Sequence, residues 1–168
     1  MARSTNRKRS GIRRNSATRG IRLSFSNLGT DIMIRPPRVS ETGELSFVVT
    51  DQHIIDFADE QMPAVLCTPW LIWFLEHAAR EAMLPLLDSG ESTVGVHIDV
   101  EHLAPTPVGQ NVTCTARVIH VDGNVISFSL KAHDEHEEIA RGTHKLSVIH
   151  KERLNRRVTT KQSRLRSG

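Results

Sequence analysis

The feature that most constrains the fold is one long apolar helix pattern over residues 68–87. Thr68 is a good helix N-cap residue, and Pro69 would follow at the first helical position, where its missing N–H costs nothing. Apolar residues then recur at helical spacing: Leu71, Leu75, Ala78, Ala82 and Leu86, with Ile72, Ala79 and Met83 alongside. So wide a stripe predicts a largely buried helix, which Pro85 and then Gly90 end.

Short β-rich runs lie on both sides of this helix. They cover residues 44–50 before it and residues 93–103, 111–121, 125–132 and 139–149 after it. A short helix is also expected at residues 54–60. The later runs alternate apolar and polar residues, and Asp122-Gly123 marks a hairpin turn. One long helix followed by an antiparallel meander with an apolar face predicts an α+β fold in which a sheet wraps around the helix.

Charge divides the chain into an acidic body and two basic ends. Residues 1–22 carry eight Lys/Arg and no acid, residues 23–150 carry seven Lys/Arg and eighteen Asp/Glu, and residues 151–168 carry seven Lys/Arg and one Glu. We therefore expect a disordered extension at residues 1–30, one domain at residues 31–150 and a solvated basic tail at residues 151–168.

Three interpretations of the first segment stay open. It is a basic tail with weak affinity for nucleic acid or anionic surfaces, a stretch upstream of a true start at Met33, or a transit peptide. Nucleic acid is expected as a partner only through the tails, if at all, because the body is acidic and the tails lack interleaved aromatic residues.

Composition excludes several classes of protein. No apolar run approaches the roughly 18–20 residues of a membrane helix, so we expect no membrane association. The only two cysteines, Cys67 and Cys114, exclude a disulfide scaffold and a four-cysteine zinc site and favour a reduced, cytoplasmic setting. No dinucleotide-binding, P-loop or HExxH motif is present, and we expect neither a metal nor a cofactor.

Two polar residues interrupt the apolar faces. Glu76 lies at the edge of the helix stripe, and His102 has the parity of Val94, Val96 and Ile98 in the following strand. A carboxylate and an imidazole that face one interior form a candidate acid–base pair. The structural alternative is a boundary glutamate on the helix flank and a satisfied histidine at a strand end.

Three stretches carry a resemblance to a known family: LCTPWLIWFLEHAAREAM from Leu66, GVHIDVEHLAPTPVG from Gly95 and RGTHKLSVIH from Arg141. Together with the order of elements, they resemble the hotdog acyl-CoA thioesterases of the fluoroacetyl-CoA thioesterase type. The resemblance covers roughly residues 42–155. It implies that Thr68, Glu76 and His102 are catalytic and that the Gly95 backbone lies against the thioester.

The resemblance also implies a homodimer, or a dimer of dimers, with acyl-CoA at the subunit interface. Residues 62–65 have no aromatic residue where the specialised enzyme has a gating one, so we expect general short-chain acyl-CoA hydrolysis. The free N–H groups of Trp70 and Leu71 at the helix start are expected to stabilise the oxyanion. Thr68 and Glu76 would lie about 12 Å apart along one helix. They then flank the substrate, or the helix starts irregularly, or a partner subunit closes the gap.

Two other functions fit the same fold: a non-catalytic acyl-CoA-binding module and a hydratase or dehydratase. The second would require an Asp/His pair in a strand-to-helix loop, whereas Glu76 is on the helix. Among weaker candidates, Cys67 is expected to be a buried apolar residue and His144 a core residue. The acidic, histidine-containing turn at residues 133–138 is expected to be solvated.

Overall fold

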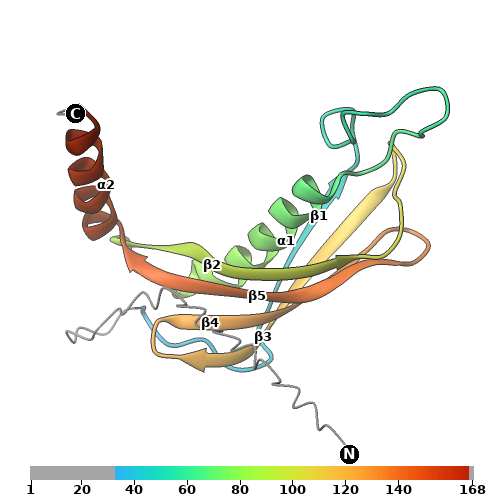
Figure 1. Ribbon diagram of the computed structural model, residues 1–168. Helices are drawn as coiled ribbons and strands as arrows, with labels where there is room; N and C mark the ends of the chain where they lie inside the picture. Colours follow the sequence, from blue (N-terminus) through green and yellow to red (C-terminus); the bar gives the residue numbers. More distant parts are fainter. Residues whose placement is uncertain (1–32, 167–168) are drawn as a thin grey trace, which may run out of the picture. The chain divides into compact units, whose positions relative to one another are not determined.

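The computed structural model describes residues 33–166, so the expectations for residues 1–30 fall on residues outside this part. The elements follow in this order: β1 (Thr42–Val48), α1 (Thr68–Met83), the 3₁₀ turn η1 (Leu84–Leu86), β2 (Glu91–His102), β3 (Asn111–Asp122), β4 (Val125–His133), β5 (Glu138–His150) and α2 (Lys151–Arg166). Figure 1 shows a curved sheet with α1 lying across its concave side. This is the α+β arrangement predicted from the sequence.

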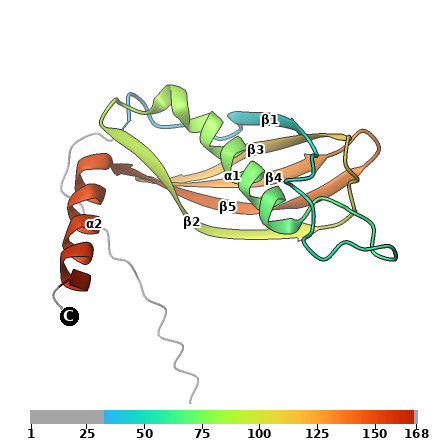
Figure 2. The same cartoon turned by 90° about the horizontal axis from the view of Figure 1, so that it is seen from above.

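The sheet is antiparallel, with the strand order β1-β3-β4-β5-β2. Strands β3 to β5 form the expected consecutive hairpins. The expectation of one meander is wrong for β2, which pairs with β5 instead of its neighbour in sequence, β3. Strand β2 is therefore at an edge of the sheet, beside the exposed flank of α1 (Figure 2).

The core lies between α1 and the inner face of the sheet. Buried α1 residues are Leu71, Phe74, Leu75, Ala78, Ala79 and Met83. They pack in one cluster with inward residues of the sheet, among them Val112, Cys114, Ala116, Ile126, Phe128, Leu130 and Leu146. Strand β1 crosses the helix at Gly43, where a Cβ atom would collide with the backbone of Ala78 and Ala82. Glycine is needed there because strand and helix backbones touch.

Local structure departs from the sequence prediction at three places. Cys67, not Thr68, is the N-cap of α1, and Thr68 is already helical. The helix expected at residues 54–60 is absent, because this segment forms turns and an isolated bridge between Ile54 and Leu66. Residues 151–166 form helix α2, where no helix was expected. No helix in residues 33–166 has the length and apolar character needed to cross a membrane.

Candidate active site

A hydroxyl and an imidazole meet at the N-terminal end of α1. The Thr68 Oγ1 atom lies 3.0 Å from Nδ1 of His102, the last residue of β2. Burial lowers the pKa of His102, with a smaller opposing effect from the backbone of Ala104. The ring is therefore neutral near pH 7. Its other nitrogen, Nε2, is buried and has no hydrogen-bond partner within the described chain.

A second cluster forms where the middle of α1 faces β2. A Cβ atom built on Gly95 would lie 3.0 Å from Oε1 of Glu76 and 3.3 Å from Cε1 of His144. Gly95 is itself exposed. The Glu76 carboxylate thus lies against an open stretch of backbone that carries no side chain.

A β-bulge places Gly95 in this position. The pairing of β2 with β5 shifts between Gly95 and His97, so that Val96 is the extra residue and its side chain is 46% exposed. A bulge changes the parity of the side chains that follow it. Gly95 and His102 therefore both face α1, whereas the expected common face of Val96 and His102 is wrong.

His144 belongs to this cluster and is buried, which confirms the expectation of a core residue. It is 2% exposed, and its Nδ1 lies 2.7 Å from the carbonyl oxygen of His97. Burial lowers the pKa of His144, while the hydrogen bond to His97 and the charge of Glu76 oppose that shift. Its Nε2 is buried without a partner among the described residues. The inward parity of the histidine on its strand was the available signal.

The two clusters are separate within one chain. Thr68 and Glu76 are eight residues apart on one uninterrupted helix, a rise of about 12 Å. The irregular helix start considered from the sequence is therefore not present. One chain brings Thr68 together with His102, and Glu76 together with Gly95 and His144. It does not bring Thr68 and Glu76 into contact.

The first turn of α1 provides fewer free donors than expected. The Leu71 N–H donates to the Cys67 carbonyl at 3.2 Å, and the Leu71 side chain is fully buried. The prediction that Leu71 binds substrate therefore does not fit. Pro69 has no N–H, so Trp70 carries the remaining donor of that turn beside Thr68. The Trp70 ring packs edge-on against His53 at 5.2 Å between ring centroids.

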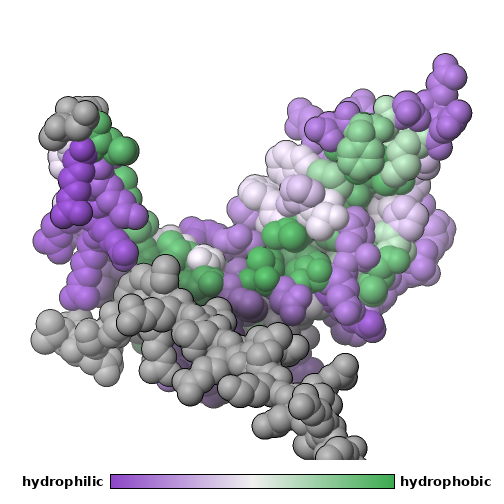
Figure 3. Space-filling view, in the orientation of Figure 1, coloured by the Kyte–Doolittle hydropathy of each residue, from purple (hydrophilic) through white to green (hydrophobic). Residues whose placement is uncertain are grey.

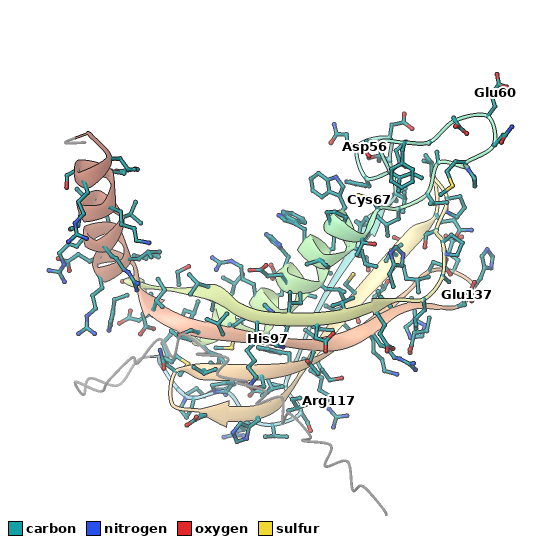
Figure 4. The ribbon with its side chains drawn as sticks, viewed as in Figure 1. Asp56, Glu60, Cys67, His97, Arg117 and Glu137 are labelled. Carbon is teal, nitrogen blue, oxygen red and sulfur yellow. The ribbon has the colours of Figure 1, made fainter. Side chains whose placement is uncertain are left out.

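The weaker candidates form no alternative centre. Cys67 is half-buried, while burial raises the pKa of Cys114 to about 12. The turn after β4 is organised by Asp134, whose Oδ1 accepts hydrogen bonds from the backbone N–H groups of His136 at 2.8 Å and Glu137 at 2.9 Å. Side chains of this turn, including the labelled Glu137, point away from the sheet (Figure 4). Across residues 33–166, no group of three His, Cys, Asp or Glu residues could hold a metal ion.

Comparison of the sequence with known proteins identifies the family of this chain. The family model described as fluoroacetyl-CoA-specific thioesterase matches residues 49–152. The fluoroacetyl-CoA thioesterase of Streptantibioticus cattleyicolor is 38% identical over 130 residues, which cover 74% of this chain and 94% of that protein.

Solved structures agree. A crystal structure of a mutant of the fluoroacetyl-CoA-specific thioesterase FlK is similar with a TM-score of 0.70 and 36% identity, covering 76% of this chain and 98% of that one. A thioesterase superfamily member from Thermus thermophilus has a TM-score of 0.74 and 25% identity, covering 80% and 100%.

Fold and similarity together define a hotdog thioesterase, a hydrolase that acts on acyl-CoA thioesters. Within that class, the chain belongs to the fluoroacetyl-CoA-specific thioesterase family.

Proposed function

We propose that the protein hydrolyses short-chain acyl-CoA thioesters at a site that two copies of the chain build together. The observation that carries this proposal is the Glu76 carboxylate, which α1 presents to the exposed backbone of Gly95. The relative from Streptantibioticus cattleyicolor is named for fluoroacetyl-CoA. Here residues 62–65 lack an aromatic side chain, which supports a wider range of short acyl groups.

In the proposed reaction, Glu76 acts as the general base. It accepts a proton from a water molecule whose oxygen bonds to the thioester carbonyl carbon. The C–S bond then breaks, and the CoA thiolate takes the proton from Glu76, which leaves a free acid and CoA. The N–H of Trp70 of the partner subunit, at the start of its α1, is the proposed donor to the oxyanion. No metal or redox cofactor is part of this scheme, because CoA thiolate is a good leaving group.

Thr68 and His102 are proposed to complete the site. In the tautomer protonated at Nε2, His102 accepts a hydrogen bond from the Thr68 hydroxyl through Nδ1. Since burial lowers the pKa of His102, this neutral tautomer is available at pH 7. The Thr68 hydroxyl uses its one proton in this hydrogen bond, so the donor left for the leaving group or the oxyanion is the Nε2–H of His102, which has no partner within the described chain.

The separation of the two clusters supports a homodimer formed through β2. This strand has twelve residues and is at a sheet edge, where no other strand of residues 33–166 pairs with its outer backbone groups. Antiparallel pairing with the β2 of a second copy into one continuous sheet requires a two-fold axis perpendicular to the sheet between the two strands. An axis between Gly95 and His102 would bring Gly95 and Glu76 beside the partner subunit's His102.

Exposed apolar residues favour the same interface. Trp73 on α1 is 44% exposed, and the bulge residue Val96 on the edge strand β2 is 46% exposed. Figure 3 shows apolar surface along this region of α1 and β2.

We also propose a cytoplasmic location, supported by the two unpaired cysteines.

The test is steady-state release of CoA thiol from a panel of acyl-CoAs, acetyl to decanoyl and including fluoroacetyl-CoA, with wild type and Glu76→Gln. We expect turnover of the short chains and a loss of about 100-fold or more in kcat for the variant. Retained CoA binding without turnover of any thioester by wild type would contradict the proposal and favour a binding module.

A further inference from the structure

Helix α2 was not expected from the sequence, and its side chains have little packing against the rest of the chain. It is tied to the domain at its start, where the Lys151 N–H donates to the Gly90 carbonyl at 2.9 Å and Lys151 Nζ donates to the Ser89 carbonyl at 2.8 Å. Every side chain from Lys151 to Leu165 is exposed. The helix therefore extends away from the sheet into solvent.

A solvated helix of this composition is not stable by itself. It has sixteen residues, near the length at which even alanine-rich helices are marginal in water. Val158, Thr159 and Thr160 lie consecutively in its middle, and all three are β-branched, which lowers helix propensity. Seven Lys/Arg against one Glu add repulsion between like charges. Packing against another body would provide the missing stabilisation.

One face of α2 is suited to such packing. Leu154, Val158 and Leu165 are four and seven residues apart, so they lie within about 40° of one another around the helix. All three are exposed, Leu165 by 83%. In Figure 3 apolar side chains of α2 lie on the flank that faces across β2 toward α1. Basic side chains surround this stripe.

A segment of opposite charge lies near the other end of β2. It is the connection between β1 and α1 at residues 50–63, which we call the acidic loop. It contains four acidic residues and no Lys or Arg. Asp56 and Glu60, labelled in Figure 4, are exposed and project outward from it. Phe57 is 64% exposed, and Met62 is exposed as well. The loop therefore offers negative charge and apolar side chains together, as α2 offers positive charge and an apolar stripe.

Within one chain α2 and the acidic loop are at opposite ends of β2, so they cannot meet. Figure 1 shows both rising on the α1 side of the sheet, and Figure 2 shows both extending on the outer side of β2. A two-fold axis perpendicular to the sheet exchanges the two ends of β2 and keeps α1 on the same side. We infer that α2 is an arm that packs on the acidic loop of a second copy of this chain. The inference rests on the dimer proposed above.

This contact would act next to the partner's catalytic threonine. Four residues separate the acidic loop from α1, and the loop is tied to the helix start because the Cys67 N–H donates to the His53 carbonyl at 2.8 Å. The Ile55 N–H likewise donates to the Val65 carbonyl at 3.0 Å. An arm on the loop would therefore hold the segment that precedes Thr68.

Charge reversal in the full-length chain tests the arm. One variant carries Arg153→Glu and Arg157→Glu, and the other carries Asp56→Lys and Glu60→Lys. Each removes two attractive pairs from both symmetric contacts and introduces repulsion. At low ionic strength, we expect each variant alone to raise the dimer Kd on the order of 100-fold in sedimentation equilibrium. Arg117→Glu and Asp122→Lys, both on β3, are controls expected to leave the Kd unchanged.

Mixing the two variants is the decisive step. In the mixed dimer both arms face loops of opposite charge, so we expect a heterodimer with a Kd near that of wild type. An unchanged Kd for the arm variant, or a mixture that stays monomeric, would overturn the arm. A wild type that stays monomeric at every concentration would overturn both the arm and the dimer. Thioester hydrolysis is tested independently of the arm by the CoA-release assay. If the Arg153→Glu/Arg157→Glu variant stays dimeric but, unlike wild type, does not bind phosphatidylserine vesicles, α2 binds a polyanionic surface and the arm is overturned.

Discussion

Gly95→Ala is the most informative single change in the candidate site. The new Cβ atom would lie 3.0 Å from Oε1 of Glu76 and 3.3 Å from Cε1 of His144. A contact of this length is tighter than most Cβ contacts, so the carboxylate must move by a few tenths of an ångström. A displacement of about 1 Å can cost 100-fold in rate, and the new methyl group also occupies the space beside the carboxylate where the thioester is proposed to lie. We expect kcat/KM for acetyl-CoA to fall about 10- to 100-fold.

The same substitution is expected to leave the fold intact. The φ angle of Gly95 is outside the left-handed region, and the atom that must move is the end of a flexible side chain. Replacing glycine by alanine at a compatible position stabilises a protein by about 0.4–1 kcal/mol through the unfolded chain. Circular dichroism should therefore show a Tm within a few degrees of wild type. Wild-type kcat/KM at an unchanged Tm would refute the assignment of the reacting position to the Glu76–Gly95 contact.

Two other glycines are matched controls. A Cβ atom on Gly90 would meet nothing within 4 Å, so Gly90→Ala should change neither activity nor Tm. A Cβ atom on Gly142 would collide with the backbone of Asp99 on the neighbouring strand, so Gly142→Ala should lower the Tm. The pattern expected for Gly95→Ala, lost activity with retained stability, differs from both.

Three further predictions concern the catalytic pair, the core and the response to pH. Thr68→Ala removes the hydroxyl beside His102 and should lower kcat at least about 10-fold in the thiol-release assay, while Thr68→Ser should keep most of it; equal rates for both would contradict the pair. Gly43→Ala should cost about 2 kcal/mol or more in urea unfolding, because β1 must move off α1; an unchanged midpoint would show that the crossing is not close. His102 and His144 have lowered pKa values in the folded chain, so the unfolded chain binds protons more readily. Stability should therefore fall as pH drops below about 6.5 and level off below the folded pKa values. A shallower decline for His144→Gln than for wild type would support this assignment, whereas an unchanged decline would contradict it for His144.

Periodicity predicted the helix and the strands because burial decides both. The Thr68-Pro69 start and the apolar stripe identified α1, although Cys67 is the N-cap. Alternation identified the later strands, with β3 from Asn111 to Asp122 close to its predicted bounds. Alternation could not reveal the bulge at Val96, because an extra apolar residue extends the apparent pattern. Pairing of β2 with β5 depends on contacts far apart in sequence, which no local pattern carries.

The sequence indicated most of the candidate residues, but not their grouping. Inward parity indicated His102, and helix spacing indicated Glu76. The sequence could not show that Thr68 contacts His102 while Glu76 and His144 both lie beside Gly95, since these groupings depend on how α1 crosses the sheet. Helix α2 was missed because its charged composition favours a solvated tail when no partner surface is considered.

The shared site is tested most directly by complementation between two inactive chains, Glu76→Gln and His102→Asn. In a mixed dimer with shared sites, one site receives both substitutions and the other receives neither. Random mixing gives half heterodimers, each with one intact site, so we expect about a quarter of wild-type kcat per site. If the mixture has no more activity than the two variants have alone, Glu76 and His102 do not act together across the interface, and the account of the site is wrong.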